Sequence, residues 1–315
     1  MKWGKALTQD WLDLPVTVTR EISGHIYERP GLWMEPAALD SLAGELRAVA
    51  ATSLPAGPLD YGVFAPGTGA FDRAIITVLR DRSDGRPVAF NALSAMDVSH
   101  RGARTTVTHL GLVLIDPGTR GRGFSWALYG LTTLLLFVRN QLRPLWISSV
   151  TQVPAVVGLV TEGFDNVYPA PGRNSVRRFD HLLLARQIMR DHRDVFGVGK
   201  DADFDEDRFV IRNAYTGGSD HLKKSFADSS KHRDAVHNDF CERELDYDRG
   251  DDVLQIGEMN LQAARRYLTK DVPRASLPGV LAMLAFLLLQ RLTLPLVYWF
   301  TPSRRWGLLR PWREQ

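Results

Sequence analysis

The sequence predicts an α/β protein in which a mixed, mostly antiparallel sheet is flanked by helices. Three observations indicate this class. Three extended segments follow one another between residues 73 and 115, separated only by short turns. The third segment leads through a glycine-rich turn into an apolar helical stretch. Strand-like and helix-like segments then alternate as far as residue 268.

The N-terminal elements come before this sheet region. Residues 22–32 predict a short strand and a loop. Residues 35–51 carry leucine and valine at helical spacing, and Pro36 suits the first turn of a helix. The sequence therefore predicts one helix between the N-terminal strand and the later strands.

The first strands of the main sheet are predicted at residues 73–80, 87–98 and 104–115. An Asp-, Ser- and Gly-containing turn at 81–86 separates the first two, and a shorter turn at 101–103 separates the second and third. Because such short turns join antiparallel strands, the order predicts a three-stranded meander.

A glycine-rich turn follows the third strand. The apolar residues 110–115 end at an Asp-Pro-Gly sequence, since proline lacks a donor for the sheet and glycine frees the turn. Residues 120–125, Arg-Gly-Arg-Gly-Phe-Ser, then lead directly into a predicted helix at 126–139. Backbone N–H groups and the positive end of a helix meet at this point, which predicts a phosphate site.

This turn has neither the G-x-G-x-x-G nor the G-x-x-x-x-G-K-[ST] pattern of nucleotide sites. It resembles the acyl-CoA signature of the GNAT superfamily of N-acetyltransferases, [RQ]-x-x-G-x-[GA], although a serine stands at the last position. The resemblance implies that the turn binds the CoA pyrophosphate through Arg120, Gly121, Arg122, Gly123, Phe124 and Ser125. It also implies that the preceding strand pairs with the pantetheine arm at Val113, Leu114 and Ile115. The alternative is an ordinary strand-to-helix turn that needs glycine.

The region after the helix is similar to the closing part of a GNAT domain. Residues 144–150 predict a strand, and residues 155–161 predict a short helix. Gly163-Phe164 then precedes a last strand at 165–168, as in the family, where a helix runs into Gly-Phe. The resemblance spans about residues 35–170 and implies an acyl-CoA-binding domain at 1–170.

The catalytic residues are predicted from the same resemblance. His109 lies where many family members carry a glutamate, and a neutral histidine can take the part of the base. Leu159 lies where the family often has a tyrosine that protonates the thiolate. Either a hydroxyl at the end of the fifth strand replaces it, or thiolate release is assisted only by backbone and solvent, or the domain has lost catalysis. The predicted catalytic residues are therefore His109, Ser149 and Thr151, with Ser148 beside them. The alternatives are a histidine satisfied within the sheet, and strand-ending hydroxyls with only local roles.

Residues 171–270 are predicted to form a charged α/β extension. Helices are expected at 181–190, 221–245 and 261–268, and strands at 207–215 and 252–258. The final segment, 271–315, is different in character. Its apolar run at 277–300 is interrupted by Gln290-Arg291 and by prolines, and tryptophans and arginines alternate to residue 313. We expect a membrane-surface anchor at 277–313, a core or dimer contact, or a spanning helix.

Composition excludes several classes of protein. The chain has 315 residues, 44% of them hydrophobic and 24% charged, which suits a globular protein with a sizeable core. A net charge of +3, spread along the chain, does not favour nucleic-acid binding. The single cysteine excludes a disulfide framework, and the histidines show no paired metal-ligand spacing, although His232 and His237 are close. No apolar signal region follows Met1. We therefore expect a cytoplasmic protein that is either free or bound at the periphery of the membrane.

Together these features predict an acyl-CoA-dependent N-acyltransferase. The donor is acetyl-CoA or a longer acyl-CoA, or a carrier-protein thioester, and no metal is expected. The acceptor is a small-molecule or lipid-like amine, and a homodimer is possible. The competing hypothesis is a catalytically inactive GNAT-fold binding or membrane-tethered interaction module, which Leu159 favours and the glycine turn disfavours.

Overall fold

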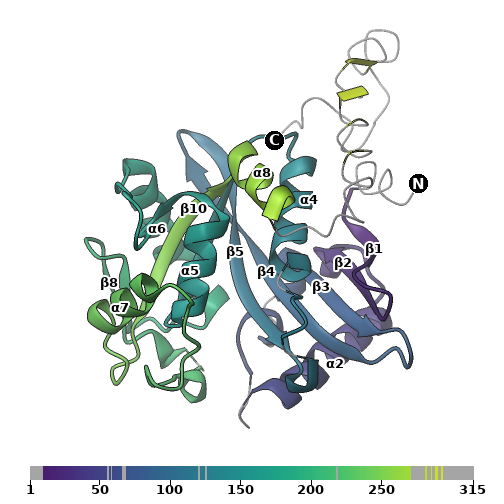
Figure 1. Ribbon diagram of the computed structural model, residues 1–315, viewed down its shortest axis with the longest axis horizontal. Helices are drawn as coiled ribbons and strands as arrows, with labels where there is room; N and C mark the ends of the chain where they lie inside the picture. Colours follow the sequence, from purple (N-terminus) through teal and green to yellow (C-terminus); the bar gives the residue numbers. More distant parts are fainter. Residues whose placement is uncertain are drawn as a thin grey trace.

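The protein was analysed as a computed structural model. It describes residues 10–54, 57, 59–65, 69–119, 121–124, 126–217 and 219–270, with 281, 285, 288, 289, 292 and 293. These residues form a mixed α/β fold around a ten-stranded sheet (Figure 1). The strand order is β1-β2-β3-β4-β5-β6-β10-β9-β8, and β7 pairs with β10 off this path. Among the strand pairs of the described residues, β5–β6 is parallel and the others are antiparallel, which confirms a mixed, mostly antiparallel sheet.

The ten strands are β1 (Asp13–Thr17), β2 (Ile22–Glu28), β3 (Ala74–Asp81), β4 (Pro87–His100), β5 (Ala103–Ile115), β6 (Leu145–Thr151), β7 (Asp165–Tyr168), β8 (Asp203–Asp205), β9 (Val210–Arg212) and β10 (Asp252–Met259). The helices are α2 (Pro36–Ser53), α3 (Ala70–Arg73), α4 (Thr132–Arg139), α5 (Pro154–Gly163), α6 (Phe179–Asp191), α7 (Ala235–Glu244) and α8 (Leu261–Lys270). A π-helical turn, Trp126–Leu131, leads directly into α4.

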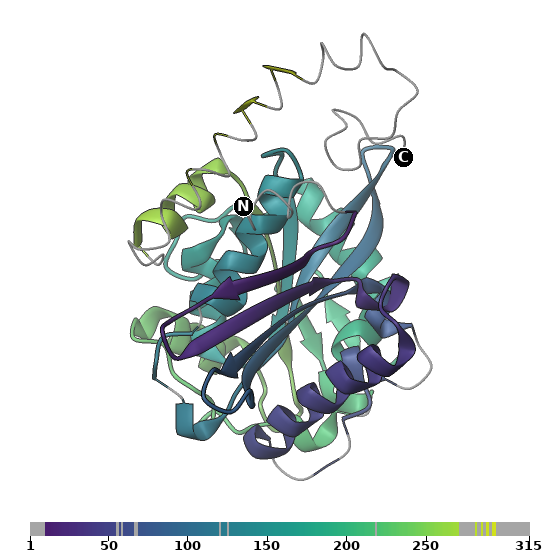
Figure 2. The same ribbon diagram turned by 90° about the vertical axis from the view of Figure 1, so that its right-hand side faces the viewer.

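Helices cover both faces of the sheet (Figure 1, Figure 2). Apolar side chains of the π-helical turn, α4, α5 and α8 share one core with the sheet. On the opposite face, α2 packs over β3 and β4, and α6 packs over β10 and the far end of β4. We call these the α4/α5 face and the α2/α6 face. Side chains that alternate along the central strands therefore divide between these two faces.

A buried ion pair ties α4 to the N-terminal hairpin. Arg139, at the end of α4, places its Nη2 3.0 Å from Oε2 of Glu28, at the end of β2. The side chains are only 5% and 14% exposed. The backbone N–H of Leu12 also donates to Oε2 of Glu28, at 3.0 Å. Because neither charge is well solvated, each depends on the other for compensation.

Most of the elements predicted from periodicity are confirmed, but one helix is wrong. The long polar helix expected at 221–245 begins only at Ala235. Asp234 has an extended backbone, and its side chain accepts the Val236 N–H at 3.1 Å, so it caps the helix there. The strand expected at 207–215 shortens to β9 because Phe209 and Asn213 have positive φ angles of 57° and 55°. Strand β1 was not expected.

The residues after 170 extend the same sheet. Strand β10 pairs with β6 from Val253↔Thr151 to Met259↔Leu145, and β9 and β8 follow. Within the described part of the chain, no helix combines the length and apolar character that a membrane span requires. The described leucines of the C-terminal segment, 281, 288, 289 and 292, are exposed. Most of 277–313 lies outside the described residues, so its membrane contact stays a prediction.

Candidate functional site

Strands β5 and β6 part at His109. Their parallel pairing covers only Val107↔Trp146, Thr108↔Ile147 and His109↔Ser148. Strand β5 continues to Ile115 against β4, and β6 continues to Thr151 against β10. Two neighbouring parallel strands that separate in this way expose backbone donors and acceptors along an opening in the sheet.

A β-bulge in β5 begins directly after His109. His109 lies opposite Ser94 and Leu112 opposite Ala92, so Leu110 and Gly111 together oppose the single residue between. A Cβ at Gly111 would lie 2.3 Å from the carbonyl oxygen of Ala92, and only glycine permits this approach. Because a bulge bends its own strand, it gives a physical reason why β5 leaves β6 at this point.

The glycine-rich turn lies between β5 and the helix that covers the α4/α5 face. Gly121 and Gly123 are exposed and have φ angles of +81° and +74°, which side chains rarely adopt. Phe124 is 3% exposed and anchors the turn in the core of this face. Arg122 stays exposed, with its Nη1 3.7 Å from a carboxylate oxygen of Glu21. Arg120 and Ser125, the other predicted contacts, lie outside the described residues.

The predicted pantetheine-binding residues lie on the part of β5 that has left β6. Val113, Leu114 and Ile115 pair with β4 through Asn91, Phe90 and Ala89. The side chains of Val113 and Ile115 pack into the α4/α5 core, whereas Leu114 packs toward α2. The β6-facing backbone edge therefore runs from the parting point toward the glycine turn.

His109 is buried on the α2/α6 face. Its side chain is 2% exposed, and its Nδ1 lies 3.1 Å from Oγ of Ser148 on β6. The ring of Phe196 lies against the imidazole, with the centroids 5.0 Å apart. Burial lowers the pKa of His109 to about 3, so the ring is neutral at physiological pH. The partner of His109 is Ser148 rather than Ser149 or Thr151.

Ser149 and Thr151 occupy different surroundings. Ser149 pairs with Gln255, whose side chain donates to the carbonyl oxygen of Val157 in α5, so Ser149 also faces α5. Its Oγ is buried and has no hydrogen-bond partner among the described residues. Thr151 instead uses its Oγ1 to accept the N–H of Val153 at 3.0 Å. Ser149 therefore offers a free hydroxyl, and Thr151 has a local role in ending the strand.

The structure places Leu159 in α5, partly buried in the core of the α4/α5 face. Ser149 lies on this same side of the sheet, whereas His109 and Ser148 lie on the other. The predicted polar residues thus divide into two groups on opposite faces of the parted strands.

Asp252 is a buried acidic residue that no motif or spacing in the sequence indicated. This residue begins β10, is 6% exposed, and accepts the hydroxyl of Tyr215 at 3.2 Å. Burial, with a smaller contribution from the neighbouring Asp251 carboxylate, raises the pKa of Asp252 to about 7, although the Tyr215 hydrogen bond opposes the shift. Its neighbours in β10, Leu254 and Ile256, pack toward α6, so Asp252 lies on the face of His109. The sequence feature that could have indicated this site is an acidic residue at the start of an apolar strand.

No family model matches the sequence, and no curated protein matches it. The ribosomal-protein-S5-alanine acetyltransferase from Vibrio fischeri is similar over 78% of this chain and 96% of its own, with 9% identity and a TM-score of 0.31. A conserved protein of unknown function from Enterococcus faecalis V583, a probable N-acyltransferase, is also similar. The similarity covers 55% of this chain and 45% of that protein, with 10% identity and a TM-score of 0.30. TM-scores this low do not identify a function for the chain. The function is therefore inferred from the geometry of the site.

Proposed function

We propose that the protein is an N-acyltransferase that takes the acyl group from acyl-CoA. The observation that carries this proposal is the parting of β5 and β6 after His109, on a strand that continues toward a glycine-rich turn and a helix. In the reaction the amine nitrogen attacks the thioester carbonyl carbon. A C–N bond forms, the C–S bond breaks, the amine loses a proton, and the thiolate is stabilised or takes one up.

The donor binds from the α4/α5 face in this proposal. The amides of residues 120–125 hold the pyrophosphate, and the backbone of 113–115 pairs with the pantetheine arm. Support comes from the position of the turn, since Phe124 packs under the helix on this side. The departing sulfur then lies near Ser149, whose buried Oγ lacks a partner in the described structure. Ser149 would stabilise the thiolate by donating a hydrogen bond to it, a role that Leu159 cannot fill.

The acceptor amine binds from the α2/α6 face, where His109 and Ser148 lie. The neutral imidazole of His109 accepts a hydrogen bond from the amine and takes up its proton as the C–N bond forms, while Oγ of Ser148, 3.1 Å from Nδ1, orients the ring. The acceptor is a small-molecule or lipid-like amine, and the acyl group is acetyl or longer. A peripheral membrane contact through 277–313 would favour the amphipathic acceptor, and the proposal includes a homodimer.

Calorimetric titration with acetyl-CoA and with a long-chain acyl-CoA tests the donor site. The variant is Gly123→Trp, because a side chain at φ +74° strains the turn and fills the space above its amides. Gly102→Trp is the matched control, since Gly102 is also exposed, has φ +78°, and lies in the β4–β5 turn. We expect saturable binding to the wild type and to the control, and loss of binding in Gly123→Trp.

The preferred donor in this titration would also define the acyl length. Absence of binding to either donor would refute an acyl-CoA enzyme. That result would favour the competing hypothesis of an inactive binding module, which is based on the presence of leucine, not tyrosine, at position 159.

A further inference from the structure

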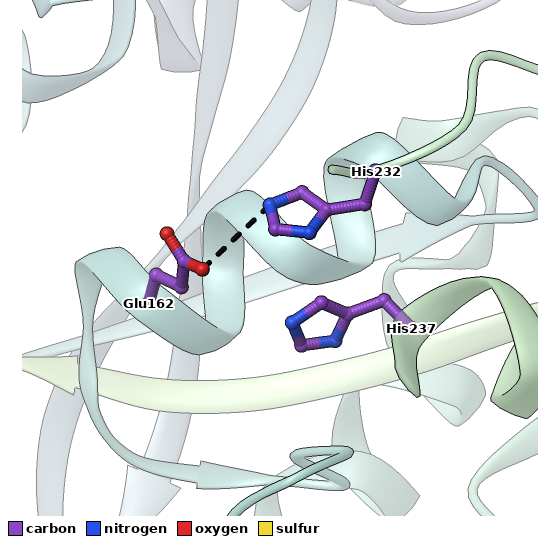
Figure 3. A group of neighbouring side chains, drawn as sticks. All are labelled: Glu162, His232 and His237. Carbon is purple, nitrogen blue, oxygen red and sulfur yellow. Dashed lines mark ion pairs between the residues drawn. The ribbon is translucent and has the colours of Figure 1, made fainter. Parts of the chain in front are cut away.

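Two histidines and one glutamate form a cluster between α5 and the start of α7 (Figure 3). Glu162 comes from the last turn of α5, His232 from the segment before α7, and His237 from the first turn of α7. One ligand atom of each side chain lies within 4.8 Å of the others. Figure 3 shows His232 and His237 on the same side of Glu162. Sequence spacing did not reveal this group, because Glu162 precedes His232 by 70 residues.

The ring of His232 is held in place by its surroundings. It packs directly on the backbone of α5 at Gly158, where an added Cβ would lie 2.4 Å from the ring. Gly158 and Glu162 are one helical turn apart, so the ring and the carboxylate share one side of α5. The His232 backbone is fixed by two hydrogen bonds to the Asn238 side chain, of 2.8 and 3.0 Å. Little of this arrangement has to be ordered when a ligand binds.

His237 is the member of the cluster that the protein fold leaves unsatisfied. Its side chain is 3% exposed, and its Nδ1 has no hydrogen-bond partner within the described structure. Its ring meets that of His232 edge to face, with the centroids 4.6 Å apart. A ring nitrogen that carries no proton is the atom through which an imidazole binds a metal ion.

Glu162 adds a negative charge with one oxygen already oriented. Nη2 of Arg233 lies 2.7 Å from its Oε2, while Oε1 faces Nε2 of His232 at 3.8 Å. That distance is too long for a hydrogen bond, so the carboxylate and the imidazole are near each other without bonding directly. A bridging cation would interact with both.

We propose that Glu162, His232 and His237 bind a divalent transition-metal ion of the zinc class. Two imidazoles and one carboxylate are a common ligand set for zinc, with water in the fourth position. Ligation through Nε2 of His232 moves its ring proton to Nδ1, which now accepts the Asp234 N–H at 3.1 Å, so that hydrogen bond is given up. The carboxylate moves inward by about 1 Å, since Zn–N and Zn–O bonds are only about 2.0–2.2 Å long. The ion would join α5 to α7 and to the segment that precedes it.

The test is zinc titration of the full chain after treatment with chelator, followed by calorimetry and metal analysis. We expect one zinc per chain, a rise in Tm on binding, and a four-coordinate visible spectrum when cobalt is substituted. Glu162→Gln is the first variant because its side chain is 40% exposed and the change is small. His237→Gln is the second, and His221→Gln outside the cluster is the matched control.

The expected result is at least a tenfold weaker zinc affinity in each cluster variant and an unchanged affinity in the control. Circular dichroism without zinc confirms that each variant is folded. Absence of stoichiometric zinc binding to the wild type would overturn the proposal. Zinc binding that persists unchanged in Glu162→Gln and in His237→Gln would also overturn it, because the ion would then be bound elsewhere.

Discussion

The wild-type protein should lose unfolding free energy as the pH rises from 4 to 8, because the buried carboxyl of Asp252 ionises. Replacing Asp252 by asparagine should remove most of that loss. The carboxyl of Asp252 is buried at the start of β10 and has a pKa raised to about 7. In the unfolded chain the same group titrates near pH 4. Below pH 4 both states are protonated and the group has no effect. Between pH 4 and 7 the unfolded state ionises first, so stability falls as pH rises, and above pH 7 the full penalty is present.

The size of this penalty follows from the pKa difference. A shift from 3.8 to about 7 is roughly 3 pKa units. At about 1.4 kcal/mol per unit, this corresponds to about 4 kcal/mol of lost unfolding free energy. Asparagine keeps the side-chain oxygen that accepts the Tyr215 hydroxyl but has no proton to lose. The variant should therefore match the wild type near pH 4 and be more stable by up to about 4 kcal/mol at pH 8.

Urea denaturation of both proteins at pH 4, 5, 6, 7 and 8 measures this difference directly. The comparison between wild type and variant cancels the titration of the other groups. Asp248→Asn, an exposed change in the turn before β10, is the matched control and should give a flat difference. A difference between wild type and Asp252→Asn that does not grow with pH would show that the carboxyl is well solvated, and would refute the reasoning.

Three further predictions follow from the parted strands and the core. Gly111→Val should destabilise the fold by at least about 1–3 kcal/mol and weaken acyl-CoA binding, because the valine Cβ would clash with the Ala92 carbonyl oxygen. An unchanged free energy of unfolding and an unchanged Kd for acyl-CoA would contradict this. Arg139→Met should cost about 3–5 kcal/mol, because the largely buried Glu28 carboxylate loses its countercharge, and a second change, Glu28→Leu, should restore much of the loss in urea denaturation. His109→Gln should lower kcat by about 10²-fold. The acid limb of the pH–rate profile above pH 5 should stay unchanged, because the pKa of the imidazole is about 3. An acid limb that shifts in this variant would disprove the assigned protonation state of His109.

The sequence predicted the local elements well because their signals are local. The alternating and apolar runs at 73–115 gave the meander, and helical spacing gave α2 and α8. The helix expected at 221–245 failed because polar residues gave no apolar stripe that could fix its start, and the cap at Asp234 decided it instead. Strand β1 has a clear alternation of buried and exposed residues, but five residues give a weak signal.

The arrangement of the site could be predicted only in part. The sequence located His109 and the glycine turn, but it could not assign Ser148 and Ser149 to opposite faces. That assignment depends on the register of β6 against both of its neighbours. The raised pKa of Asp252 likewise depends on burial by residues distant in the chain. Pairing across long sequence separations is set by tertiary packing, which local propensity does not encode.

The same long-range pairing explains why the sheet opens where it does. Strand β6 is held by β10 along its whole length, from Leu145 to Thr151, so it cannot follow β5 when β5 bends. The bulge at Gly111 bends β5 away while β4 keeps it paired on its other edge. An opening therefore needs both the local glycine and a strand contributed by residues after 170. For this reason the C-terminal part of the described chain belongs to the structure of the site, even though it carries no recognisable motif.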